Sequence, residues 1–213
     1  MPDEVFRLFA FARHAESEAN AAHVLASDPS RPVALTARGR AQARALGAQL
    51  AGLPMDLAVG TRLLRTQQTI DIALDGRPVP VLIEADFDEL RVGDLDGAPM
   101  DAYWSWKHQH TSDDRLPHGE SVHDALRRYA GALRRLLARD DTVTLVIVHE
   151  LALRYITAAA AGASPVPGTA FPNAVPYLLD QRAVQRAAAS LDALALPGPP
   201  QARPGGQAAG GGA

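Results

Sequence analysis

The sequence predicts an α/β fold, a three-layer α/β/α sandwich around a mostly parallel central sheet. Short apolar runs of strand length alternate along the chain with longer segments of helical periodicity, as in parallel sheets covered by helices. The most apolar run, TVTLVIV at residues 142–148, has the continuous hydrophobicity of a strand buried on both faces. Polar side chains follow two of these runs directly, at residues 13 and 149.

Two strand–helix pairs are predicted in the first part of the chain. Residues 7–12 (RLFAFA) form the first strand, and a helix over about 36–53 follows, opening at a threonine suited to the N-cap. Residues 56–59 form a short second strand. The next helix covers 62–74, with Thr61 near its cap.

A third short strand at 79–83 is followed by a long polar segment with aromatic residues, from 86 to 119. Ser121 to Asp124 then fits a capping box that opens a helix. The apolar side of this helix recurs at helical spacing, at Val122, Ala125, Tyr129, Leu133 and Leu136.

The last predicted elements surround the most apolar strand. Residues 142–148 form that strand, a helix covers 151–161, and residues 173–180 (NAVPYLLD) form a final strand. Pro176 cannot donate to a ladder of hydrogen bonds, which predicts that the final strand lies at an edge or carries a bulge.

Length and composition predict one folded domain, residues 1–196, with a Pro/Gly/Ala-rich tail at 197–213 that we expect to be disordered. The net charge is −3, from 21 basic and 24 acidic residues, which predicts no nucleic-acid or membrane partner.

The absence of cysteine excludes thiol chemistry and disulfides. The first apolar segment is too short for a signal peptide, so a cytoplasmic location is expected.

Four basic side chains are predicted to meet at one edge of the sheet. Arg13, His14 and His149 each follow a strand, and Arg65 lies in the helix after the 56–59 strand. Because ligands in α/β folds bind beyond the carboxyl ends of the strands, these residues describe an anion site with a nucleophile. Phosphoryl transfer would also need an acid for the leaving oxygen. The candidates for that acid are Glu84, Asp86, Asp88 and Glu89.

These residues resemble the motifs of the histidine phosphatase superfamily, in its phosphoglycerate mutase-like branch. Residues 13–20 (RHAESEAN) are similar to RHGxxxxN, and 61–69 (TRLLRTQQT) to SxLxRTxQT. Further on, 87–97 resembles LxExxxGxWxG, 119–121 resembles GES, and 148–149 the end of the strand before the second histidine. The five elements stand in the family's order, over about residues 7–180.

The resemblance implies a phosphoglycerate mutase-like fold and a role for each matched residue. His14 would form a phosphohistidine, and Glu89 would protonate the leaving oxygen and then activate water. His149 is assigned to catalysis, and Arg13, Asn20 and Arg65 to binding of the phosphoryl oxygens alongside it. No metal and no organic cofactor are implied.

Three positions depart from the family pattern. Ala15 replaces the glycine of RHG, and Thr61 replaces a serine while keeping the hydroxyl. Glu150 replaces the glycine after the second histidine, where a carboxylate would oppose a bound dianion unless it points away or pairs with an arginine such as Arg154. We therefore expect Glu150 to give the enzyme either a reduced turnover rate or a distinctive substrate.

The predicted activity is metal-independent hydrolysis of a small phosphomonoester. The alternatives are mutase-type phosphoryl transfer and a catalytically weakened phospholigand-binding protein. The resemblance disfavours a mutase, because segment 97–119 is shorter than the corresponding region of phosphoglycerate mutases and lacks their lysine-rich stretch, Lys107 being the chain's only lysine. Within that segment, Tyr103, Trp104 and Trp106 could pack a lid on themselves or select the substrate. The strand at 173–180 could pair with a second copy to give a homodimer.

Overall fold

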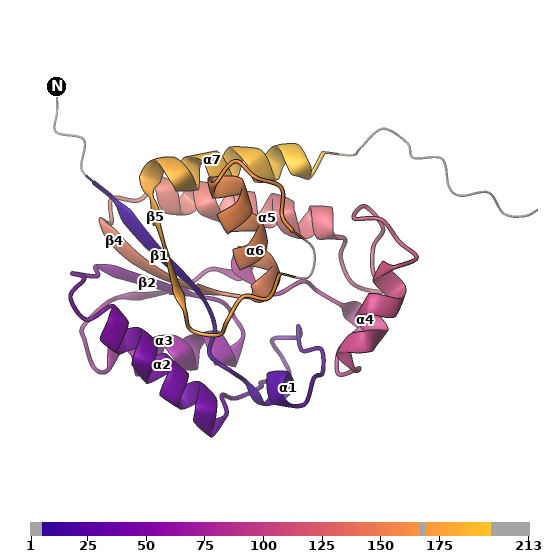
Figure 1. Ribbon diagram of the computed structural model, residues 1–213, viewed down its shortest axis with the longest axis horizontal. Coiled ribbons are helices and arrows are strands. Elements are labelled where there is room, and N and C mark those ends of the chain that lie inside the picture. Colours follow the sequence, from indigo (N-terminus) through magenta and orange to yellow (C-terminus); the bar gives the residue numbers. More distant parts are fainter. Residues whose placement is uncertain (1–5, 167–168, 197–213) are drawn as a thin grey trace, which may run out of the picture.

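Figure 1 shows the protein, a computed structural model in which residues 6–166 and 169–196 are described. The strands are β1 (Leu8–Arg13), β2 (Leu57–Gly60), β3 (Val81–Ile83), β4 (Val143–Val148) and β5 (Pro176–Asp180). The helices are α1 (Glu18–Ala21), α2 (Ala37–Gln49), α3 (Leu64–Leu74), α4 (Met100–Lys107), α5 (Val122–Leu137), α6 (Glu150–Ala160) and α7 (Gln181–Leu194). Two 3₁₀ turns, Ala85–Phe87 and Gly93–Leu95, lie between β3 and α4.

The described strands form one sheet in the order β3-β2-β4-β1-β5. The first four strands of this order are parallel, and β5 runs antiparallel to β1 at the edge. The predicted sandwich with a mostly parallel sheet is therefore confirmed. Pro176 begins the edge strand opposite Ala12, in agreement with the position that its missing N–H predicts.

The central strands separate two hydrophobic cores, since successive side chains point to opposite faces of a sheet. Phe9 and Phe11 of β1 belong to the core beneath α5, α6 and α7. Ala10 and Ala12 of the same strand belong to the core beneath α2 and α3. Figure 1 shows these two groups of helices on opposite faces of the sheet, so the strands between them are buried on both sides.

The helix opened by residue 121 forms as predicted. The Ser121 side chain accepts from the N–H of Asp124, whose carboxylate accepts from the N–H of Ser121 in return. The five apolar positions predicted for this helix are all at most 5% exposed. Helical spacing of apolar side chains was therefore sufficient to identify the face of α5 that packs on the sheet.

The bounds of two other helices differ from the predictions. The helix predicted over 36–53 ends at Gln49, because Gly52 and Pro54 follow and proline disfavours helical backbone in the residue before it. The helix predicted over 62–74 begins at Leu64, with Leu63 at the N-cap, so Thr61 lies near that cap as predicted. Its hydroxyl makes no cap hydrogen bond and belongs to the site described below.

Helix α7 was missed by the sequence analysis. Its buried face consists mainly of small residues, which give weak hydrophobic contrast: Ala183, Val184, Ala187, Ala188 and Leu191. The Asp180 side chain caps it by accepting from the N–H of Ala183 at 2.7 Å. The predicted disordered tail, 197–213, lies outside the described residues. Among the residues that are described, no helix combines the length and apolar character needed to cross a membrane.

The contact between α2 and α3 yields a test of packing against helix propensity. A Cβ built on Gly47 of α2 would lie 2.3 Å from the carbonyl oxygen of Ala73 in α3. Gly47→Ala should therefore lower the free energy of unfolding by about 1–3 kcal/mol, as overpacked cores do, although alanine is the better helix former. Gly131→Ala in α5 is the matched control, because its Cβ would meet only the Arg135 side chain at 3.5 Å. Urea denaturation should show this control unchanged or stabilised by up to about 1 kcal/mol.

Candidate active site

The site lies where β1 and β4 end side by side. Arg13 is the last residue of β1 and His14 follows it, while His149 follows the parallel strand β4. Parallel pairing in this register places the two imidazole rings 5.2 Å apart between centroids, tilted by 60°. Arg65 reaches the same point from the first turn of α3. The structure thus brings His14, His149 and Arg65 into contact, with Arg13 beside them in the pocket wall.

His14 is 2% exposed, and its backbone fixes its tautomer. Its Nδ1 lies 2.7 Å from the carbonyl oxygen of Ala15, which can only accept, so Nδ1 carries the proton. The lone pair is therefore on Nε2, where it accepts from Arg65 Nε at 3.0 Å. Burial, then the charges of Arg65 and Arg13, lower the pKa of His14 well below its usual value. The ring is thus neutral, with its unprotonated nitrogen toward Arg65.

Arg65 connects both histidines and is itself 4% exposed. Besides His14, its guanidinium donates to His149 Nδ1 at 3.2 Å and to the carbonyl of Ala26 at 2.9 Å. Burial lowers its pKa to about 10, so it remains charged at neutral pH. This cation is the most deeply placed positive charge in the pocket.

His149 is oriented by Thr61, a role that the sequence analysis did not anticipate. Since Arg65 only donates, His149 Nδ1 accepts from it and Nε2 carries the proton toward the Thr61 hydroxyl at 3.0 Å. Burial, then the Arg65 charge, lowers the pKa of His149. Thr61 therefore replaces the family serine without losing the hydroxyl that sets this ring.

Glu89 is the acidic residue that the structure places in the pocket. Its carboxylate lies 3.9 Å from His149 Nδ1, with the side chain 24% exposed. Burial raises its pKa, against the opposing charges of Arg65 and Arg13. A carboxyl group with a raised pKa can hold a proton to donate.

The other three acidic candidates are engaged elsewhere. Glu84 and Asp86 both pair with Arg135 on α5. Asp88 is 2% exposed, accepts from the backbone N–H of Arg62 and pairs with the guanidinium of the same residue. The choice of Glu89 from four neighbouring carboxylates agrees with its position in the structure.

The GES element supports the loop that carries Glu89. Buried Glu120 pairs with Arg128 and Arg91, and Arg128 also donates to the carbonyls of Asp86, Asp88 and Glu89. One guanidinium thus fixes the backbone on both sides of the acid. This element acts by positioning Glu89, and its own carboxylate does not line the pocket.

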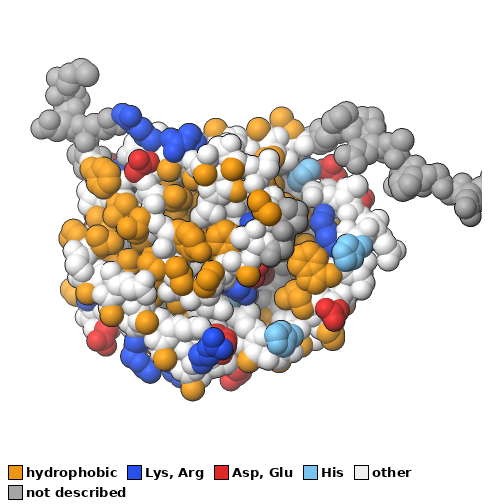
Figure 2. Space-filling model, in the orientation of Figure 1, with side chains coloured by type: hydrophobic (Ala, Val, Ile, Leu, Met, Phe, Trp, Pro, Cys, Tyr) orange, Lys and Arg blue, Asp and Glu red, His pale blue; other side chains and the backbone are white. Residues whose placement is uncertain are grey.

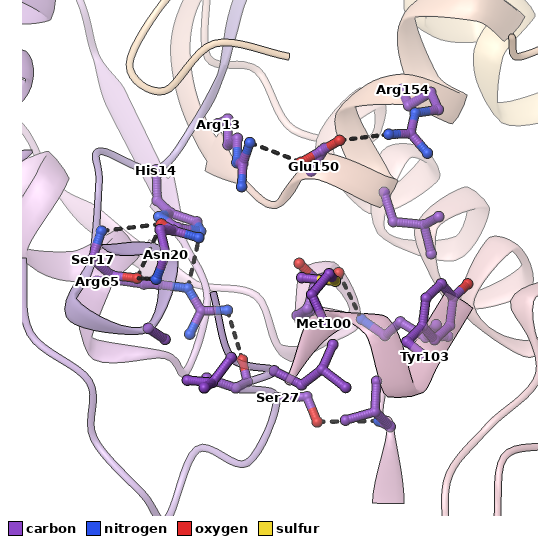
Figure 3. A pocket seen from close by; sticks show the side chains of 18 of the residues that line it. Arg13, His14, Ser17, Asn20, Ser27, Arg65, Met100, Tyr103, Glu150 and Arg154 are labelled. Carbon is purple, nitrogen blue, oxygen red and sulfur yellow. Dashed lines mark hydrogen bonds and ion pairs between the residues drawn. The ribbon is translucent and has the colours of Figure 1, made fainter. Parts of the chain in front are cut away.

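Glu150 pairs with two arginines, as Figure 3 shows. One carboxylate oxygen lies 2.8 Å from Arg13 Nη1 and the other lies 2.5 Å from Arg154 Nη2. The pairing with Arg154 that would relieve a repulsive Glu150 is present, and Arg13 contributes a second partner. The charge of Glu150 is therefore balanced within the pocket wall.

Asn20 lines the pocket from α1 (Figure 3). Its Oδ1 accepts from the backbone N–H and the hydroxyl of Ser17, the N-cap of that helix. Because the amide oxygen is used in the cap, the amide nitrogen is the group with which Asn20 can donate to an anion. All six predicted site residues thus lie in or directly behind one pocket.

The outer wall of the pocket is apolar. Met100, Tyr103 and Trp104 of α4 line it, and Figure 2 shows the surface hollowed beside this segment, with apolar side chains on the rim. Trp106 instead stacks on His110, with centroids 4.2 Å apart and planes 5° apart. Tyr103 and Trp104 also pack edge to face on each other, with centroids 5.3 Å apart, so the same aromatics pack within the segment and line the pocket. Selection of the substrate by these residues stays a prediction.

Two further residues hold the backbone of His14 and Ala15. Asn173 donates to the carbonyl of His14 at 2.7 Å, and the Thr69 hydroxyl accepts from the N–H of Ala15 at 3.0 Å. Thr69 ends the TRLLRTQQT element, so the motif did mark it, whereas no pattern marked Asn173. Within 6–166 and 169–196, no cluster of three or more metal-ligating side chains is present.

Comparison with known proteins identifies relatives of the whole fold. The 2,3-bisphosphoglycerate-dependent phosphoglycerate mutase of Brucella melitensis is 32% identical over 177 residues, 75% of this chain and 84% of the mutase. The α-ribazole phosphatase of Shigella flexneri superposes with a TM-score of 0.65 at 26% identity, covering 74% of this chain and 81% of that chain.

A mycobacterial glucosyl-3-phosphoglycerate phosphatase has the same fold, with a TM-score of 0.67 at 20% identity, covering 82% of this chain and 90% of that chain. The model of the histidine phosphatase superfamily (branch 1) matches residues 9–193, from within β1 to within α7. The predicted resemblance is therefore confirmed: the chain belongs to the histidine phosphatase superfamily, branch 1.

Proposed function

We propose that the protein is a metal-independent phosphomonoesterase that works through a phosphohistidine on His14. The observation that carries the proposal is the buried His14 ring, whose Nε2 lone pair is turned toward Arg65. Glu89, with its raised pKa, lies in the same pocket. The small-molecule substrate would be a phosphate ester, and the proposed reaction uses neither a metal nor an organic cofactor.

In the first step, Nε2 of His14 attacks phosphorus and the bond from phosphorus to the ester oxygen breaks. Arg13, Arg65 and Asn20 donate to the phosphoryl oxygens, with Arg65 exchanging its bond to His14 for one to the anion. A dianion beside His149 raises the pKa of that ring, which can then donate as well. Glu89 protonates the departing alkoxide, so that a neutral alcohol leaves.

In the second step, Glu89 is a carboxylate and accepts a proton from water. The oxygen of that water attacks phosphorus, the bond to His14 Nε2 breaks, and inorganic phosphate forms. Glu89 is protonated again and His14 recovers its lone pair, so the cycle closes. The pocket arginines stabilise the charge on the phosphoryl oxygens in both steps without a change in their own protonation.

Charge in the pocket favours hydrolysis over the mutase alternative. The charged side chains that line it are Arg13, Arg65, Arg154, Glu89 and Glu150. With Glu89 protonated, three arginines and one carboxylate leave two positive charges, which one phosphate dianion balances. A phosphoglycerate brings a further carboxylate that this set does not balance. Mutase-type phosphoryl transfer is the second candidate, because the chain is 32% identical to the Brucella mutase.

We propose that the enzyme acts in the cytoplasm and has no nucleic-acid or membrane partner, in keeping with its net charge of −3. A homodimer would pair through the β5 edge, where Leu178 is 54% exposed. Sedimentation at several concentrations, with Leu178→Lys as the comparison, tests that assembly.

Loss of the nucleophile should abolish turnover. We expect wild-type protein to hydrolyse p-nitrophenyl phosphate in EDTA, and His14→Ala to lower kcat at least about 10³-fold, since a covalent step is lost. His108→Ala is the matched control, because His108 is exposed and does not line the pocket. Activity that persists in His14→Ala would contradict the assignment. Binding of phosphate without turnover by wild type would indicate a phospholigand-binding protein, and interconversion of phosphoglycerates a mutase.

The role of Glu89 predicts both a pH profile and a leaving-group effect. His14 is neutral above its lowered pKa and Glu89 is protonated below its raised pKa, so kcat/KM should peak at mildly acidic pH and fall as Glu89 ionises. Glu89→Gln should remove the basic limb. The same substitution should lower kcat/KM for phenyl phosphate by about 10²–10⁴-fold. The loss for p-nitrophenyl phosphate should be smaller, because nitrophenolate leaves without a proton. Equal losses on the two esters would exclude Glu89 as the acid.

A further inference from the structure

The proposed hydrolysis leaves open which alcohol the phosphate is attached to. We propose, building on that function, that Glu150 is a specificity-determining residue that restricts the substrate to phosphate monoesters of apolar or aromatic alcohols without a second negative charge. The proposal stands on the Arg13–Glu150–Arg154 arrangement, on the hydrogen bonds of Arg154, and on the apolar residues around them.

Glu150 neutralises two cations of the pocket at once. It is the first residue of α6, and its side chain, 30% exposed, spans the gap between Arg13 and Arg154. Figure 3 shows the three side chains in a row beside His14, with Glu150 in the middle. Arg13 is the member next to the nucleophile, and its charge contributes to the lowered pKa of His14. Arg154, one helical turn beyond Glu150, is the member farther along the pocket wall.

Arg154 would be a second anion site if Glu150 did not occupy it. The Nη2 of Arg154 also donates to the carbonyl of Thr169 at 3.0 Å, a hydrogen bond that does not involve Glu150. Its buried Nε has no partner among the described residues. The guanidinium is thus positioned to bind a carboxylate or a second phosphate at the pocket wall, and Glu150 already holds it.

The remaining outer wall suits an uncharged group. Tyr103 and Trp104 of α4 and Leu151 of α6 line this part of the pocket together with Met100. Burial raises the pKa of Tyr103 to about 12, so its hydroxyl stays neutral. An aromatic or apolar alcohol would bury its surface against these side chains. A carboxylate on the same alcohol would meet the charge of Glu150 and no free cation at this wall.

The test compares two aryl phosphates of nearly equal shape. 4-Carbamoylphenyl phosphate is neutral at the ring end, and 4-carboxyphenyl phosphate carries a negative charge there. We expect wild type to prefer the carbamoyl ester by about 10–100-fold in kcat/KM, the size of a like-charge penalty of one to two pKa units. Glu150→Gln should reduce that preference at least about tenfold or reverse it.

Two comparisons separate the masking of Arg154 from other effects. The double variant Glu150→Gln/Arg154→Met lacks the Arg154 cation, so the carboxyl ester should again be the poorer substrate. The improvement in kcat/KM for that ester in Glu150→Gln should therefore disappear. Glu18→Gln removes one exposed negative charge outside the pocket and should leave the ratio of the two esters unchanged. A wild-type ratio near one, or a ratio that Glu150→Gln does not change, would overturn the proposal.

Binding of the corresponding phosphonates keeps this result distinct from the proposed catalysis. 4-Carbamoylphenyl- and 4-carboxyphenylphosphonate cannot be hydrolysed, and calorimetry gives their dissociation constants for each variant. If no ester is turned over but the two phosphonates show the expected ratio and its loss in Glu150→Gln, the hydrolase assignment fails and the role of Glu150 stands. If the esters are hydrolysed without that preference, the hydrolase stands and the role of Glu150 fails.

Discussion

The site depends on one buried cation, the guanidinium of Arg65. It donates to both histidines and to a backbone carbonyl, so it holds side chains from two neighbouring strands in one arrangement. A charge taken out of water is costly unless its hydrogen bonds are satisfied, and here two of the three partners are the site histidines. The free-energy cost of burying the Arg65 charge is therefore paid at a position where a bound phosphoryl group can offset it. Glu89, Asp96 and Asp88 offset that cost from a greater distance.

Much of the fold could be predicted because its signals are local. Continuous apolar runs identified the strands at 142–148 and 7–12, and the capping box identified the start of α5. The edge position of β5 followed from a single proline. Helix α7 escaped prediction because its buried face is mainly alanine, whose contrast with polar neighbours is small. The end of α2 was misplaced because leucine spacing continued past the residues that stop the helix.

Only part of the site could be predicted from the residues themselves. Arg13, His14 and His149 were identified because they follow predicted strands, whereas Glu89 was distinguished from its acidic neighbours only by the family resemblance. The structure supplies the physical reason, since Arg62 and Arg135 engage the other three carboxylates. Thr61, predicted only to lie near a helix cap, orients His149. Asn173 had no sequence signal. Such contacts join residues that are far apart in the chain, and no local pattern records them.

The hydrogen bond from His14 Nδ1 to the carbonyl of Ala15 has a consequence for how robust the nucleophile is. In many enzymes a carboxylate fixes the tautomer of a catalytic histidine, and protonation of that carboxylate in acid releases the ring. A peptide carbonyl does not titrate, so it keeps its partner oriented under conditions in which a carboxylate would let go. The orientation of His14 is thereby independent of the acidity of the medium, and in the proposed mechanism proton transfer falls to a different residue.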